Sequence, residues 1–244
     1  MRPIGFSTGA VAKADYRRAI AELLRSQVRV IELSALRRWE LPLLVADFEH
    51  LQLRDFDFVS FHAPSRFQAV EERAVVEELD RIAALGVPIV AHPDVIFTVS
   101  EWKHFGPLLF IENMDKRKRT GRTARDLTTL FDAFPTARMC FDLGHARQVD
   151  PTMLEARLIL EQHRDRLAEV HISEVNTASR HDPISEYAVK AADLGIQIMG
   201  GMGYSAETDM QRYWRDHRIL RITPISNEMV RNSIAESLGL PRSY

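Results

Sequence analysis

The stretch FDLGHARQVD, residues 141–150, places Asp142 three residues before His145, directly after a short apolar run. An aspartate at this position can cap the helix that follows, and a single histidine is often a buried core residue. A carboxylate and an imidazole can also bind a metal ion or transfer a proton. The second interpretation predicts that other apolar runs also end in histidines or carboxylates, whereas the first does not.

Other apolar runs in the chain do end in histidines or carboxylates. The complete set is His62 in FHAPS, His92 in AHPD, Glu112 in IENMD, Asp142 and His145, His171 in VHISEVN, His181 in SRHDP, and Glu228 in ISNE. Five of the nine histidines belong to this set, which is more than scattered core histidines would give. Imidazoles mixed with carboxylates are typical ligands of Zn, Mn, Fe or Co, so the sequence predicts a divalent metal cofactor.

These residues need strands to position them, and the chain alternates short apolar runs with segments of helical period. We expect strands at 3–7, 28–33, 56–62, 87–92, 108–112, 137–142, 168–173 and 220–226, and helices at 13–26, 68–86, 123–134 and 151–167. Strands that alternate with helices indicate βα units. Eight such units predict an α/β fold, a single (β/α)8 TIM barrel, whose functional residues lie at the carboxyl ends of the strands.

The composition is that of a globular enzyme-sized protein. The 244 residues are 45% hydrophobic and 27% charged, and we expect one TIM-barrel domain over 1–244 with an enlarged connection at about 184–218. The net charge of −2 argues against a nucleic acid partner. The single cysteine, Cys140, lies in an apolar run and is expected to be buried. Without a signal peptide or a span-length apolar stretch, we expect a cytoplasmic protein without membrane contact, and a homo-oligomer remains open.

The order of these residues over successive strands resembles the xylose isomerase-like TIM-barrel superfamily, which includes sugar phosphate isomerases and epimerases and endonuclease IV. The resemblance covers nearly the whole chain. For the epimerase branch of this superfamily, the resemblance implies one metal bound by Glu112, Asp142, His171 and Glu228, with His145 in contact with the substrate. In endonuclease IV it implies three zinc ions, with His62, His92, His145 and His181 as further ligands. The chain departs from the latter pattern at Ser179, where an aspartate is expected, and from the epimerase pattern at Thr177, where an arginine is expected.

From this resemblance we expect a metal-dependent isomerase or epimerase that acts on a sugar or sugar phosphate. Glu112, Glu228 and His145 are the expected catalytic residues, since two carboxylates can transfer protons beside a metal-polarised carbonyl. Two alternatives stay open: an endonuclease IV-like zinc phosphodiester hydrolase, and a non-catalytic metal- or sugar-binding barrel.

Three further residues are candidates for binding the substrate. Lys116 lies in the basic stretch MDKRKRTGRT, which can hold a phosphate or form a solvated loop. Trp39 lies in ALRRWELP and can contact a ligand or pack under its loop. Arg180 is the basic residue nearest to the arginine position that Thr177 occupies.

Overall fold

The computed structural model describes residues 4–26 and 28–175, together with 181–182, 193, 196–197, 200–205, 207, 211 and 214. The chain divides into two compact units, Met1–His181 and Asp182–Tyr244. Nearly all described residues belong to the first unit, whose fold is given below. The expected single domain over 1–244, with its enlarged connection at 184–218, stays a prediction.

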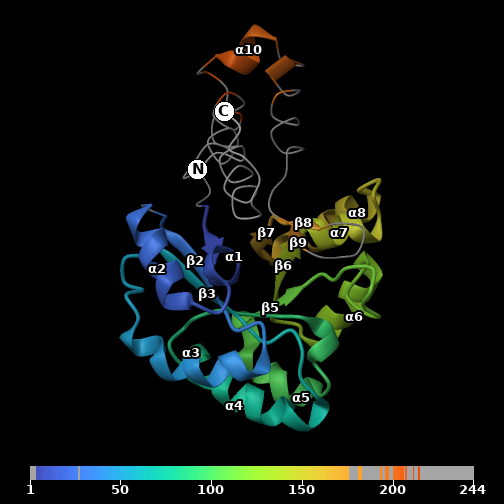
Figure 1. Ribbon diagram of the computed structural model, residues 1–244. Helices are drawn as coiled ribbons and strands as arrows, with labels where there is room; N and C mark the ends of the chain where they lie inside the picture. Colours follow the sequence, from blue (N-terminus) through green and yellow to red (C-terminus); the bar gives the residue numbers. More distant parts are fainter. Residues whose placement is uncertain are drawn as a thin grey trace, which may run out of the picture. The chain divides into compact units, whose positions relative to one another are not determined.

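Seven parallel strands form the sheet of the first unit, and each strand pairs with the next one along the chain (Figure 1). The strands are β1 (Phe6–Ser7), β2 (Val30–Ser34), β3 (Phe58–His62), β4 (Ile89–Ala91), β5 (Leu109–Glu112), β6 (Arg138–Asp142) and β7 (Leu167–His171). Two short strands, β8 (Glu174–Val175) and β9 (His181–Asp182), form a separate pair. Neighbouring parallel strands need a crossover connection, and helices supply most of these crossovers.

The helices lie around the outside of the curled sheet (Figure 1). They are α1 (Thr8–Ala12), α2 (Tyr16–Arg25), α3 (Leu41–Asp47), α4 (Glu72–Ala83), α5 (Val99–Trp102), α6 (Ala124–Ala133), α7 (Leu143–Val149) and α8 (Leu154–His163), with α10 (Gly201–Tyr204) in the second unit. Short 3₁₀ helices are η1 (Arg38–Glu40), η2 (Phe48–His50), η3 (Ala69–Glu71), η4 (Pro93–Val95), η5 (Lys103–Leu108) and η6 (Arg164–Arg166). Among the described residues, we find no helix long and apolar enough to cross a lipid bilayer.

Local sequence signals explain where two of the long helices begin. The Asp15 side chain accepts a hydrogen bond from the backbone N–H of Arg18 at 3.0 Å and caps α2. Thr123 caps α6 in the same way through the N–H of Asp126, at 3.1 Å. Each cap satisfies a backbone donor that the first helical turn leaves without a partner.

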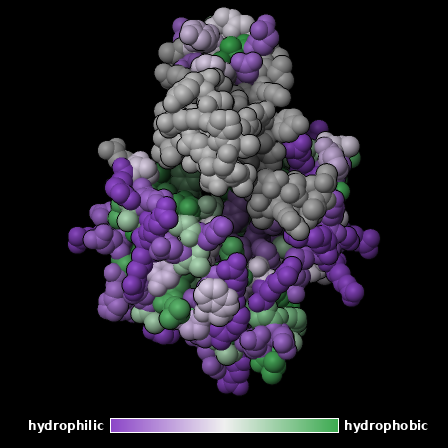
Figure 2. Space-filling view, in the orientation of Figure 1, coloured by the Kyte–Doolittle hydropathy of each residue, from purple (hydrophilic) through white to green (hydrophobic). Residues whose placement is uncertain are grey.

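The alternation of side chains along each strand separates the core from the inner face of the sheet. On β5, Leu109 and Ile111 belong to the main core between the sheet and the helices. Phe110 lies on the opposite face, in a small cluster with Val90 and Cys140. Cys140 is buried and free, as the sequence predicts. Because side chains alternate with a period of two, Glu112 shares the inner face with Phe110. On the side shown in Figure 2, hydrophobic residues are interspersed among hydrophilic ones.

The expected closed eight-stranded TIM barrel is wrong. The sheet is an open, curled half-barrel of seven strands, and within the described residues no pairing joins β7 to β1. The eighth strand, expected at 220–226, lies outside the described residues, and β1 and β7 are the two edges of the described sheet. Apolar residues at these edges are partly exposed: Phe6 on β1 exposes 42% of its surface and Val170 on β7 exposes 44%.

The other expected elements are found with shifted ends. Seven of the eight strands are present, although β1 is reduced to Phe6–Ser7 from the expected 3–7. The four expected helices correspond to α2, α4, α6 and α8, each shorter than its apolar pattern. The sequence analysis missed α3 and α7, which are only seven residues long. Such short helices span too few turns to show a clear period.

Candidate functional site

The carboxyl ends of the strands bring the predicted site residues together. His62, Glu112, Asp142 and His171 are the last residues of β3, β5, β6 and β7, and His92 directly follows β4. In a parallel sheet that curls into a barrel, these ends meet on one side. Six of the predicted residues, His62, His92, Glu112, Asp142, His145 and His171, therefore form one cluster, which we call the histidine cluster.

Glu112 lies at the centre of the histidine cluster, with 2% of its surface exposed. Four imidazoles surround its carboxylate: Oε2 is 3.1 Å from Nε2 of His62 and 3.2 Å from Nε2 of His92, and Oε1 is 3.2 Å from Nδ1 of His145 and 3.6 Å from Nδ1 of His171. Two of these rings, His62 and His92, meet edge to face with centroids 5.0 Å apart. The carboxylate thus holds four rings from four different chain segments.

Asp142 both caps a helix and belongs to the cluster. Its side chain accepts a hydrogen bond from the backbone N–H of His145 at 2.7 Å, so that α7 begins directly after β6. Asn113 fixes the same turn: its amide nitrogen donates to the carbonyl of Asp142 at 2.9 Å, and its amide oxygen accepts from the N–H of Asp142 at 2.7 Å. The helix-cap interpretation is therefore confirmed, and the same turn places Asp142 and His145 in the histidine cluster.

The sequence analysis missed a second group of acidic residues on the inner face. Glu32 on β2 places Oε2 at 3.1 Å from Nε2 of His171, and Glu169 on β7 places Oε1 at 3.4 Å from the same atom. Ser60 donates a hydrogen bond to Glu169 at 3.0 Å. The period of a strand could have revealed Glu169, because it lies two residues before His171 and shares its face.

Burial and the surrounding charges set the protonation of the cluster. Burial alone would raise the pKa of Glu112, but the surrounding imidazoles, His92 first among them, lower it well below its usual range. Burial would lower the pKa of His145, but the hydrogen bond and the charge of Glu112 raise it to about 9. At His92 burial prevails and lowers the pKa. At neutral pH, Glu112 is therefore ionised, His145 protonated and His92 neutral.

The pKa values of the remaining cluster residues also depend on the balance between burial and neighbouring charges. Burial would lower the pKa of His62, but the charges of Glu32 and Glu112 raise it. The pKa of His171 is also raised, since burial is outweighed by Cys140 and Glu32. At Asp142 burial prevails and raises the pKa. A neutral imidazole beside protonated ones can accept and donate protons, which is the chemistry that this arrangement supports.

Some of these side chains are close enough to share one cation. The ligand atoms lie within 4.8 Å of one another in three groups: His62, His92 and Glu112; Glu112, Asp142 and His171; and Glu32, Glu169 and His171. The first two groups consist of residues that the sequence analysis names as ligands, whereas Glu32 and Glu169 of the third group were not among them.

The other predicted residues lie apart or outside the described part of the chain. Trp39 is in η1 and Lys116 is exposed in the loop after β5. His181 is on β9, but its side chain is outside the described residues, as are Arg180 and Glu228.

Comparison with known proteins points to a different chemistry. A family profile described as "Acyl-CoA dehydrogenase, C-terminal domain" matches residues 156–239, which is less than half of the chain. The acyl-CoA dehydrogenase FadE12 of Mycobacterium tuberculosis is 46% identical over 61 residues, which are 25% of this chain and 16% of that protein. The very long-chain specific acyl-CoA dehydrogenase of Mus musculus is 49% identical over 51 residues, 21% of this chain and 8% of that protein. The chain thus spans only a small part of these relatives.

A likeness to solved structures was also found. Endonuclease IV from Thermus thermophilus has a TM-score of 0.46 at 16% identity, covering 72% of this chain and 79% of that one. It belongs to the superfamily that the sequence resembles. A likeness at this level carries no argument about fold or function.

These matches correct several expectations. They support the expectation that the protein is an enzyme. The expected sugar isomerase or epimerase is wrong, because the matched proteins are acyl-CoA dehydrogenases. The hydrolase and non-catalytic alternatives are overturned by the same matches. Such dehydrogenases use FAD, so the expected divalent metal is also wrong, and so is the sugar or sugar-phosphate partner.

The described residues do not fit FAD. Around Glu112 the facing polar atoms lie 3.1 to 3.6 Å apart, which leaves no room for a planar three-ring group. An open hollow of about 610 Å³ lies along α7 and α8, but its lining is largely apolar: Leu143, Met153, Ala156, Arg157, Leu160, Glu161, Arg164 and Leu167. Arg157 there is already paired with Glu161 at 2.7 Å. We therefore assign no flavin contact to the described residues.

Proposed function

We propose that this protein acts in the oxidation of an acyl-CoA thioester, as an oxidoreductase of the acyl-CoA dehydrogenase type. The observation that carries the proposal is the 46% identity over 61 residues to an acyl-CoA dehydrogenase, within a chain whose residues 156–239 match the C-terminal domain of that family. The length of the acyl chain is part of the test.

For the half-barrel we propose a role in proton transfer. Dehydrogenation of an acyl chain releases a proton together with a hydride, so a proton acceptor is required. Within the histidine cluster, His92 is the proposed acceptor, because burial lowers its pKa and keeps its imidazole unprotonated. Glu112, whose pKa is held low, would orient the imidazoles, including that of protonated His145.

The remaining predicted residues stay proposals. Glu228 lies within the matched residues 156–239 and is proposed as a catalytic carboxylate. Lys116 and Arg180 are proposed to contact the phosphates of the coenzyme, since both carry a positive charge.

A dye-linked assay tests the proposed function. Full-length protein supplied with FAD is incubated with short, medium and long acyl-CoA thioesters and an artificial electron acceptor. We expect reduction of the dye that depends on both protein and thioester, and that falls at least tenfold in Glu228→Gln. Exposed Glu77→Gln, 63% exposed at its side chain, is the matched control and should keep the wild-type rate. Absence of dye reduction with every thioester would contradict the proposal.

A further inference from the structure

Trp39 is unusually exposed for its size. It exposes 60% of its surface, whereas Trp102 is completely buried. Leu36 and Leu43 on either side of it along the chain expose 40% and 63%. We call Leu36, Trp39 and Leu43 the tryptophan shelf. It follows β2, at the end of the strand where this type of sheet carries functional residues.

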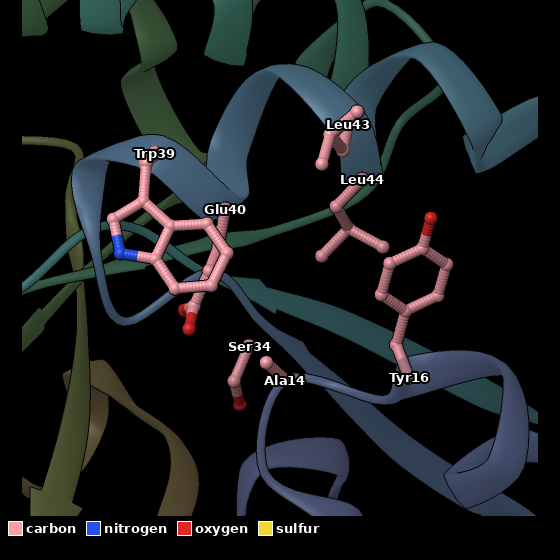
Figure 3. Close-up of a pocket in the computed structure, with 7 residues that line it drawn as sticks. All are labelled: Ala14, Tyr16, Ser34, Trp39, Glu40, Leu43 and Leu44. Atoms are coloured by element: carbon pink, nitrogen blue, oxygen red, sulfur yellow. The ribbon is translucent and has the colours of Figure 1, made fainter.

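A small cavity of about 30 Å³ lies beside the Trp39 ring (Figure 3). Its lining residues are Ala14, Tyr16, Ser34, Trp39, Glu40, Leu43 and Leu44. In Figure 3 the Glu40 carboxylate lies next to the indole ring, and Ser34 lies farther from it, with its hydroxyl directed away from the ring. A cavity of this size accepts a single small group. Its carboxylate and hydroxyl oxygens make a donor, such as an amino group, the suitable occupant.

A cationic group lies close to the same ring. The Cζ atom of Arg37 is 5.8 Å from the centroid of Trp39, and the Arg37 side chain is 63% exposed. Arg37 donates to Glu40 through Nη1 at 3.1 Å. A guanidinium has five N–H donors, so it can bind an anion while it keeps this ion pair.

Ser34 connects the cavity to the histidine cluster. Its hydroxyl donates to Oε1 of Glu32 at 3.3 Å, and Oε2 of Glu32 lies 3.1 Å from Nε2 of His171. Two side chains, Ser34 and Glu32, would therefore lie between a ligand on the tryptophan shelf and His171 of the cluster.

An aromatic platform, a small acceptor-lined cavity and a nearby guanidinium together suit a planar ring that carries an amino group and a phosphate. We propose that the tryptophan shelf binds the adenine nucleotide part of an acyl-CoA. The ring stacks on Trp39, its amino group faces Glu40 and Ser34, and a phosphate lies near Arg37. The choice of acyl-CoA rests on the proposed function, whereas the adenine preference rests on the shelf alone.

Calorimetric titration of the full-length protein with AMP and with coenzyme A tests this inference. We expect both probes to bind and to compete. Trp39→Ala should weaken each at least tenfold, and Trp39→Phe, which keeps an aromatic face, should weaken them less. Phe97→Ala, at a residue that is 47% exposed, is the matched control and should bind like the wild type. Circular dichroism shows whether each variant is folded.

Replacing AMP by IMP tests the role of the cavity, because IMP lacks the amino group that Glu40 and Ser34 would accept. We expect IMP to bind at least tenfold more weakly than AMP. Equal affinity for IMP and AMP, or AMP binding unchanged in Trp39→Ala, would overturn the inference. AMP binding without coenzyme A binding would overturn the assignment to acyl-CoA. If acyl-CoA oxidation fails while AMP still binds through Trp39, the proposed function is wrong and the adenine site stands.

Discussion

The Nδ1 atom of His145 lies 3.2 Å from Oε1 of Glu112, and the two side chains expose only 5% and 2% of their surface. Three more imidazoles approach the same carboxylate. Because a buried carboxylate is stable only with partners, this one residue couples four strand ends electrostatically.

The pKa of His145 predicts how stability depends on pH. Folding raises this pKa from 6.5 to about 9, and the rise adds about 3 kcal/mol to the free energy of unfolding. This contribution is complete below pH 6.5, where both states are protonated, and is lost as the pH rises through about 9. Urea denaturation from pH 6 to pH 10 should therefore show falling stability, roughly over the window between these two pKa values. His145→Gln should flatten this decline, and an equally steep decline in that variant would refute the assignment.

Glu112→Gln should destabilise the half-barrel strongly. The variant leaves protonated imidazoles buried without their counter-charge, which costs about 3–5 kcal/mol. Glu77→Gln removes a charge from an exposed pair with Arg73 and should cost less than about 1 kcal/mol. Chemical denaturation of both variants compares the two losses. Similar losses would mean that Glu112 has no special role in holding the strand ends.

Asn113→Ala should loosen the turn that carries His145. It removes both hydrogen bonds between the Asn113 side chain and the backbone of Asp142, and leaves two buried polar groups without partners. We expect a loss of about 2–4 kcal/mol in the free energy of unfolding. Gln52→Ala, at an exposed residue between η2 and β3, should change stability by less than about 0.5 kcal/mol. An Asn113→Ala variant as stable as this control would contradict the account.

Two glycines with the same backbone conformation should respond differently to alanine. Gly121 and Gly86 have φ angles of 76° and 77°, which any side chain adopts at a cost of about 1–2 kcal/mol. A Cβ at position 121 would lie 2.6 Å from Cγ of Pro93, whereas a Cβ at position 86 would meet nothing within 4 Å. Gly121→Ala should therefore lower the melting temperature more than Gly86→Ala. Equal melting temperatures would argue against this close contact.

The sequence predicted the histidine cluster better than the fold around it. His62, Glu112, Asp142 and His171 could be found because each ends an apolar run, and a parallel sheet gathers such ends. Glu32 was missed because it lies within its strand, where a charged residue draws attention only if the inner face is known to be polar. Barrel closure depends on pairing between distant strands, which local patterns do not encode.

The dehydrogenase match could not be predicted from local patterns either. Residues 184–218 show helical periodicity and no shift in composition, a pattern that favours an enlarged connection within one barrel. Amphipathic helices of unrelated families share the same apolar period. Residue-by-residue sequence identity over a continuous stretch can distinguish such families, whereas apolar periodicity cannot.

Mass spectrometry of the thioester tests the proposed oxidation most directly. Full-length protein, supplied with FAD and an electron acceptor, is incubated with the acyl-CoA thioesters, and the masses of the products are measured. The account predicts a product that has lost two hydrogen atoms, formed in proportion to the protein added. Recovery of every thioester at its original mass would contradict the account.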